Sequence, residues 1–181
     1  VKGMSTFSKS TYSLFSILAF ANTKVADYLA HIINPSISFG VNSFGKLPFL
    51  PADEGAEQIA EKNVQLSERD WDSFETSWDF TTHPLVSMSK GLWEQTNVAC
   101  MMEHYYGELP KVSCPLEICY LLWQGQCNER FKKLKANEEE LNRIFIDIYG
   151  VQDELTPEVE DKDVTGRKAD LQRDIKSLLS Y

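Results

Sequence analysis

The feature that most restricts the fold of this chain is a long run of apolar residues spaced three and four positions apart, the spacing of one helix face. Pro115 stands where a first helical turn begins, and Gly150 supplies a stop. We therefore predict one helix of roughly 35 residues, about 50 Å long, which Gly125 weakens locally without breaking it. Its apolar positions are Leu116, Tyr120, Trp123, Cys127, Phe131, Leu134, Leu141, Phe145 and Ile148.

A second helix is expected at the end of the chain. An acidic connection that contains a proline covers 151–163, and Leu171, Ile175, Leu178 and Leu179 then mark an amphipathic pattern. Together, the long helix and this shorter one predict an antiparallel helical hairpin.

The first fifty residues combine a helical and a strand-like pattern. Helical spacing of apolar residues predicts a helix over about 12–33, which the Asn-Pro step at Pro35 ends. Ile37, Phe39 and Val41 then alternate with small residues, a pattern typical of a strand. We expect a mainly α fold with a small β element near the N-terminus and a long C-terminal helical hairpin.

The middle of the chain is polar and then aromatic. Residues 53–66 are typical of a polar helix, and Ser67 begins a capping-box-like sequence that favours another short helix. The aromatic residues that follow are interpreted as a pad packed on a core: Trp71, Phe74, Trp78 and Phe80. These patterns divide the chain into an N-terminal part (1–50), a mixed helical connector with the aromatic cluster (51–112) and the helical hairpin (113–181).

Charge and cysteine content limit the class of protein. The net charge of −9 argues against a protein that binds DNA with its whole surface, because phosphate binding needs lysine and arginine. The first fifty residues are the exception, since Asp27 is their one acid among four lysines. No apolar run is long enough to cross a bilayer. The four cysteines form no Cys-x-x-Cys pair, which favours buried, reduced thiols in a cytoplasmic protein.

No catalytic motif is present in the sequence. It lacks the Gly-rich phosphate and dinucleotide loops, the helical zinc-protease motif and the Gly-x-Ser-x-Gly elbow. A zinc site of three cysteines with His104 and a metal-nuclease site with Glu158, Asp174 and Lys176 are conceivable. Their spacings match no compact metal motif, and buried thiols and a solvated helix face explain the same residues. We therefore predict no metal site and no catalytic residue.

Basic residues near aromatic ones suggest a further nucleic-acid surface. Arg130, Lys132, Lys133 and Lys135 follow Trp123 in the sequence. A second group lies near the C-terminus and comprises Arg167, Lys168 and Arg173. A solvated helix face with ordinary charge pairs is the favoured explanation of both groups.

Several blocks of the sequence resemble one family. Three early blocks are similar to the end of the target-recognition domain of class I adenine-specific DNA methyltransferases: Leu18–Lys24, Ile33–Phe39 and Gly45–Pro48. Three later blocks resemble the C-terminal region of the PglX-type methyltransferases of BREX phage-defence systems and of related combined restriction-modification enzymes: Asp70–Phe80, Asn137–Gly150 and Glu154–Asp163. The resemblance covers most of the chain and is weakest over 84–114.

The resemblance implies a segment without its own chemistry. Members of this family transfer a methyl group from S-adenosylmethionine to adenine and flip the base out of the duplex. Their catalytic Asn-Pro-Pro-Tyr and cofactor motif lie in an upstream domain. Here Asn34-Pro35 is followed by Ser36 and Ile37, so no catalytic or cofactor residue is carried over. The site-specific methyltransferase activity and the S-adenosylmethionine are expected in the parent protein.

Two hypotheses about function remain at this point. The first is a DNA target-recognition and scaffold segment that contacts double-stranded DNA and the parent's catalytic domain. The candidate DNA-binding residues are Lys2, Lys9, Lys24, Lys46, Arg130, Lys132 and Lys133. The alternative is a helical protein-interaction module that docks other defence-system components or the parent's catalytic domain.

Overall fold

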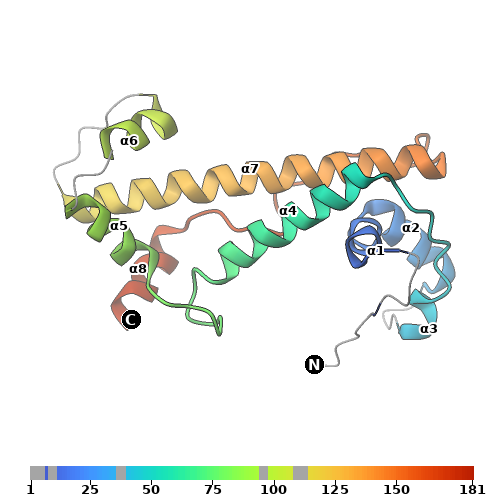
Figure 1. Ribbon diagram of the computed structural model, residues 1–181, viewed down its shortest axis with the longest axis horizontal. Helices are drawn as coiled ribbons and strands as arrows, with labels where there is room; N and C mark the ends of the chain where they lie inside the picture. Colours follow the sequence, from blue (N-terminus) through green and yellow to red (C-terminus); the bar gives the residue numbers. More distant parts are fainter. Residues whose placement is uncertain (1–6, 8–11, 36–39, 94–97, 108–113) are drawn as a thin grey trace. The chain divides into compact units, whose positions relative to one another are not determined.

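The computed structural model describes residues 7, 12–35, 40–93, 98–107 and 114–181, with side chains omitted for 91–93. All regular structure in this part of the chain is helical (Figure 1). In chain order the helices are α1 (Leu14–Ala21), α2 (Lys24–Ile33), α3 (Val41–Phe44), α4 (Glu54–Trp71), α5 (Pro84–Trp93), α6 (Val98–Tyr106), α7 (Pro115–Tyr149) and α8 (Leu171–Ser180).

The expected β element near the N-terminus is wrong. The residues that the structure describes include no strand, and Val41 begins the short helix α3 instead of ending a strand. Ile37 and Phe39 lie outside the described residues. Gly40 accepts backbone hydrogen bonds from Ser43 and Phe44, which starts a helical turn. A short alternating pattern forms a stable strand only when other strands pair with it, and the described residues include no strand that could do so.

The helix expected over 12–33 is two helices. Thr23 caps α2, because its Oγ1 accepts a hydrogen bond from the backbone N–H of Ala26 (3.3 Å) and donates one to the Phe20 carbonyl (2.7 Å). These local bonds compete with a continuous helical backbone. Ser13 caps α1 in the same way through the N–H of Ser16 (3.0 Å). The apolar spacing continues across the break, so periodicity alone does not locate it.

Helix α7 confirms the predicted long helix, whereas the hairpin needs correction. Residues 150–170 connect α7 to α8 without a helix, far more than the two to five residues of an αα-hairpin loop. The two helices expected over 53–66 and from Ser67 are also one helix, α4. Ser67 lies inside it and caps nothing.

The chain forms two compact units, which we describe separately. Unit 1 contains residues 1–64 and 135–164, and unit 2 contains residues 65–134 and 165–181. The long helices α4 and α7 contribute residues to both. The division predicted from the sequence, into 1–50, 51–112 and 113–181, concerned functional segments and stays a prediction.

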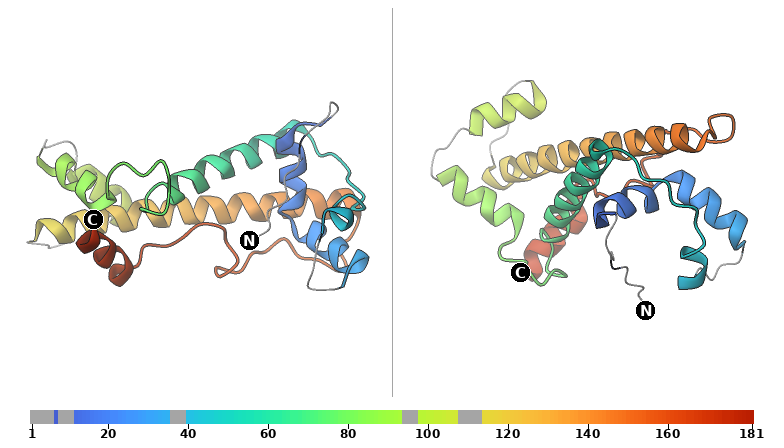
Figure 2. Two further views of the ribbon diagram at one scale, coloured as in Figure 1. Left: turned by 90° about the horizontal axis from the view of Figure 1, so that it is seen from below. Right: turned by 45° about the vertical axis from the view of Figure 1, so that its right-hand side comes forward.

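Unit 1 is built around Phe20. Its ring stacks on Tyr149 and meets Phe49 and Phe145, with 5.6 Å between ring centroids in each pair. Helices α1 and α2 lie beside the C-terminal end of α7 (Figure 2). The fully buried members of this core are Ala19, Phe20, Val25, Ala26, Ala56, Ala60, Leu141, Phe145 and Ile146.

Asn142 joins three segments of unit 1. Its side chain is 3% exposed. Its Oδ1 accepts a hydrogen bond from the Lys24 backbone N–H (2.9 Å), and its Nδ2 donates to the Pro157 carbonyl (3.1 Å). The start of α2 and the acidic connection are thereby fixed to α7.

Replacing Asn142 by alanine is expected to lower the free energy of unfolding by about 1–3 kcal/mol, since two backbone groups lose their partner. Urea unfolding of the two proteins measures this difference. Arg143→Ala is the matched control, because Arg143 is exposed on the same helix and its ion pair with Glu140 lies at the surface. Equal losses in the two variants would contradict the assigned role.

Unit 2 packs α5 and α8 against the first half of α7. Its buried residues are Leu85, Cys119, Trp123 and Cys127, and Ile175 and Leu178 of α8 pack against them. Gly125 has a clear role here. A Cβ at this position would lie 2.4 Å from Cγ of Tyr105 on α6, so the close approach of α6 to α7 requires glycine.

Candidate functional site

The predicted N-terminal lysines have different surroundings. Lys2 and Lys9 lie outside the described residues. Lys46 is exposed after α3. Lys24 is the first residue of α2, and its Nζ donates to the carbonyl of Glu158. The charge of Lys24 is therefore already engaged in unit 1.

The acidic connection explains why Lys24 is engaged. Residues 151–163 carry six acidic side chains and one lysine. Hydrogen bonds from its own backbone and from Thr156 lower the pKa of Glu158, and the charge of Lys24 adds to this effect. Tyr28 of α2 also donates a hydrogen bond to Glu154. The excess of lysine in the first fifty residues is thus partly neutralised by folding.

Cationic and aromatic side chains gather in unit 2, in what we call the cation–aromatic cluster. Its aromatic rings come from the end of α4, the turn after it and α7. Its cations come from α7, α8 and the segment just before α8. The members are Trp71, Phe74, Trp123, Phe131, Arg130, Arg167, Lys168 and Arg173.

Two guanidinium groups share the ring of Phe74. The Cζ atoms of Arg167 and Arg173 each lie 5.1 Å from its centroid, and Arg167 is also 5.9 Å from the ring centroid of Trp71. The two charges are therefore no more than about 10 Å apart, within a Debye length at moderate salt. Asp174 pairs with Arg173, and the charge of Arg167 acts on Asp70.

Arg167 and Arg173 differ in how their donors are used. Arg173 is held by hydrogen bonds from Nε to Asp174 (2.8 Å) and from Nη2 to the Lys168 carbonyl (3.0 Å). The Arg167 side chain is exposed, and no hydrogen bond or ion pair of its guanidinium is found among the residues that the structure describes. Stacking on Phe74 and Trp71 orders this guanidinium and leaves its five N–H donors available to an anion.

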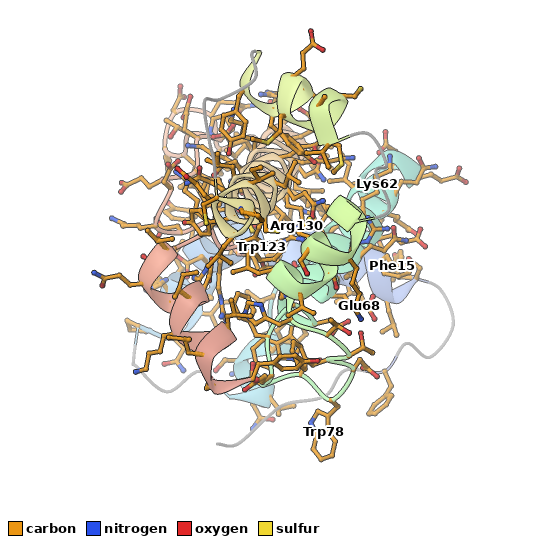
Figure 3. The ribbon with its side chains drawn as sticks, turned by 90° about the vertical axis from the view of Figure 1, so that its left-hand side faces the viewer. Phe15, Lys62, Glu68, Trp78, Trp123 and Arg130 are labelled. Carbon is orange, nitrogen blue, oxygen red and sulfur yellow. The ribbon has the colours of Figure 1, made fainter. Side chains whose placement is uncertain are left out.

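Arg130 occupies the interior of the cluster. Its side chain is 17% exposed, and Cζ lies 4.8 Å from the Trp123 ring (Figure 3). Its Nη2 lies 3.6 Å from Oδ1 of Asp70 and 3.3 Å from Sγ of Cys127. Burial raises the pKa of Asp70 above its usual value, and the charge of Arg130 opposes this rise. Arg130 is therefore a packing partner of Asp70 and Trp123, whereas Lys132 and Lys133 are exposed on the same helix.

Asp174 fixes α8 to α7. Its carboxylate is 2% exposed and accepts hydrogen bonds from Trp123 Nε1 (3.0 Å), Arg173 Nε (2.8 Å) and the Asp170 backbone N–H (3.1 Å). The Asp170 side chain caps the same helix through the N–H of Arg173 (2.7 Å). These contacts set the position of Arg173 within the cluster.

The residues considered for metal binding have other surroundings. Cys100 and Cys114 are exposed, and Cys119 and Cys127 are buried, so the expectation of buried thiols is confirmed for two of the four. Burial raises the pKa of Cys127 to about 12, which keeps this thiol protonated and unreactive. Asp174 is fully occupied by its hydrogen bonds. Over the described ranges, the structure brings together no group of three or more metal-ligating side chains.

Comparison with known proteins gives two curated relatives. The chain is 41% identical to the adenine-specific methyltransferase PglX of Lacticaseibacillus casei (strain Zhang) over 183 aligned residues, which cover 99% of this chain and 14% of PglX. The chain is related to a segment of PglX. It is also 28% identical over 144 residues to the adenine-specific methyltransferase BrxX of Escherichia coli O9:H4 (strain HS), covering 80% of this chain and 10% of BrxX.

The similarity to PglX confirms the family resemblance that the sequence blocks indicate. The chain spans about one seventh of the PglX relative and one tenth of BrxX. No model of a known protein family matches the chain, and no solved structure does. None of the helices in the described part is long and apolar enough to cross a membrane.

The sequence analysis did not select two members of the cation–aromatic cluster, Arg167 and Arg173, as candidate DNA-binding residues. Arg167 and Arg173 were noted as basic residues near the C-terminus, but only Arg130, Lys132 and Lys133 were selected from unit 2. Phe74 is the signal that could have suggested them, because an aromatic ring in a polar turn can hold a guanidinium over its face.

Proposed function

We propose that this chain is a non-catalytic, DNA-positioning segment of an adenine-specific DNA methyltransferase of the PglX type. The single observation that carries the DNA role is the exposed guanidinium of Arg167, which lies over two aromatic rings. Among the described residues it makes no hydrogen bond or ion pair, although its charge attracts the carboxylate of Asp70. The similarity to PglX along almost the whole chain supports the choice of parent protein. Reading of the base sequence is assigned to the remainder of such a protein.

The expected ligand of Arg167 is a backbone phosphate of double-stranded DNA. A planar guanidinium presents paired N–H donors that match two phosphate oxygens. Because stacking already restricts the side chain, little rotamer entropy remains to be lost on binding. Arg173, whose Nε pairs with Asp174, lies over the same ring and places a second guanidinium near Arg167. Lys132 and Lys133 on α7 extend the positive charge of unit 2.

The DNA-binding residues predicted from the sequence are expected to contribute unequally. Lys46, Lys132 and Lys133 are exposed and suited to phosphate contacts. Lys24 is expected to contribute least, since its ammonium group already donates to Glu158. Lys2 and Lys9 stay predictions from the sequence. Arg130 is assigned to positioning, because it is mostly buried.

Catalysis and the methyl donor are assigned to the parent protein. The sequence contains neither the family's Asn-Pro-Pro-Tyr nor its cofactor loop. We therefore assign no S-adenosylmethionine contact to this chain and derive no chemical step through it. The chain is proposed to hold or steer DNA while another domain performs the transfer.

The Arg167→Gln variant tests the DNA role. Its affinity for a fluorescent DNA duplex, measured by anisotropy at low salt, is expected to fall several-fold, by about 1 kcal/mol for one lost phosphate contact. Lys176→Gln is the matched control, because it removes one exposed cation from α8 outside the cluster. Loss of affinity in Lys176→Gln as large as that in Arg167→Gln would show a general charge effect and contradict the assignment of Arg167.

A further inference from the structure

Trp78 is the most exposed large apolar side chain of the described residues. Its indole is 100% exposed and projects away from the ribbon (Figure 3). The sequence-based interpretation placed it in an aromatic pad on a core, and this is wrong for Trp78. Tryptophan is highly buried on average, so full exposure of an indole is unusual.

The turn that carries Trp78 is held by hydrogen bonds. Residues 72–79 form consecutive turns between α4 and α5. Ser77 Oγ donates to Oδ1 of Asp72 (2.6 Å) and accepts from the Asp79 backbone N–H (3.1 Å). The Ser77 backbone N–H donates to the Phe74 carbonyl (2.9 Å). The exposure of Trp78 therefore belongs to a defined turn.

The sides of this turn are anchored to the rest of unit 2. Phe74 lies beneath the guanidinium groups of Arg167 and Arg173. After the turn, the ring of Phe80 meets Tyr181 edge to face, with 5.7 Å between centroids. Trp78 thus stands between two anchored aromatic residues, so binding through it requires little reordering of the turn.

Charge decides between a nucleic acid and a protein as the partner of Trp78. Glu75 and Asp79 on the same turn are exposed acids, and Asp72 carries a third carboxylate. Asp79 follows Trp78 directly, whereas Arg167 and Arg173 lie over Phe74 at the start of the turn. A phosphate placed at the indole would therefore be repelled by the carboxylates. A protein pocket with an apolar floor and lysine or arginine at its rim complements both the indole and the carboxylates. Tryptophan is also enriched among the residues that dominate binding energy in protein interfaces.

We propose that Trp78 is the anchor by which this segment docks into an apolar, basic-rimmed pocket elsewhere on a PglX-type polypeptide. The assignment of this partner rests on the similarity to PglX, in which the matching segment is 14% of a much longer chain. It does not depend on DNA binding by Arg167. The indole fills the pocket, and Glu75 and Asp79 pair with its rim.

Hydroxyl-radical footprinting with mass spectrometry tests the proposal. The oxidation rate of each tryptophan is compared between the free chain and a full-length PglX of L. casei in which this chain replaces the matching segment. In the free chain, Trp78 is expected to react faster than the half-exposed Trp71 and the buried Trp123. In the full-length protein, the rate of Trp78 is expected to fall to that of Trp123. An unchanged rate of Trp78 overturns the proposal.

The Trp78→Ser variant distinguishes docking from a role in folding. In the free chain it is expected to leave the unfolding midpoint in urea unchanged, because the side chain makes no buried contact. In the full-length protein it is expected to increase proteolytic release of the segment, whereas Leu179→Ser, which alters another highly exposed residue, does not. Equal release in both variants contradicts a specific anchor. If Trp78→Ser instead weakens duplex binding by the free chain, the partner is nucleic acid and the proposal fails, while Arg167 is judged separately.

Discussion

Replacing Asp174 by alanine is expected to lower the free energy of unfolding by about 3–5 kcal/mol, because a buried carboxylate loses several hydrogen bonds and each bond to a charged group contributes about 1.5–3 kcal/mol. The carboxylate is buried, and its loss leaves the Trp123 indole N–H and the Nε–H of Arg173 without their acceptor. Helix α8 is held to α7 through these contacts. Urea unfolding followed by tryptophan fluorescence measures the change.

The neighbouring Asp170 provides the control for this prediction. Its side chain caps α8 and is exposed, so Asp170→Ala is expected to cost about 1 kcal/mol, the typical value of an N-cap. The conservative Asp174→Asn variant keeps an acceptor for Trp123 and should fall between the two. If Asp174→Ala destabilises the protein no more than Asp170→Ala does, the claim that Asp174 holds α8 to α7 is contradicted.

Phe145→Ala is expected to destabilise the protein by about 3–5 kcal/mol, as for other fully buried aromatic residues. Phe145 is 0% exposed, and its ring lies 5.6 Å from that of Phe20. Deleting the ring leaves a cavity beneath α1, at the centre of unit 1. Chemical denaturation gives the magnitude, and hydrogen exchange of α1 amides reports the local effect.

Ile148→Ala on the same helix is the comparison for Phe145. Ile148 is among the exposed apolar residues of α7, so its truncation is expected to cost less than about 1 kcal/mol. Similar losses for the two variants would mean that the ring stack around Phe20 does not form the core of unit 1.

Helical periodicity predicted the longest element and failed where local side-chain bonds override it. The apolar pattern from Leu116 to Ile148 places α7 correctly, since one face of the helix is buried over most of its length. The same pattern runs across Thr23, where a side-chain cap divides two helices. Such a cap is a weak signal inside an apolar run.

The mistaken β element and the mistaken division of α4 into two helices share another cause. The alternation around Val41 and the capping-box-like sequence at Ser67 are local patterns. In the structure, Val41 begins α3 and Ser67 lies inside α4. Asp70, the last member of that sequence, is instead buried beside Arg130 of α7. Sixty residues separate these two side chains in sequence, and no local rule pairs them.

The candidate site was predictable only in its composition. The sequence shows aromatic residues over 71–80 and basic residues near 130 and 170, but not that Arg167 and Arg173 share the ring of Phe74. The hydrogen bond from Lys24 to the Glu158 carbonyl could not be predicted from the sequence either, because it forms only when the acidic connection packs beside α2. The type of parent protein was inferred from the family resemblance, whereas Arg167 was selected from its contacts in the structure.

The salt dependence of duplex binding by the purified chain tests the central claim most directly. If Arg167 and its neighbours contact phosphates, the logarithm of the association constant falls linearly with the logarithm of salt concentration. Arg167→Gln should then reduce the slope by about one. Absence of duplex binding even at low salt, or an affinity that salt does not change, would contradict the account.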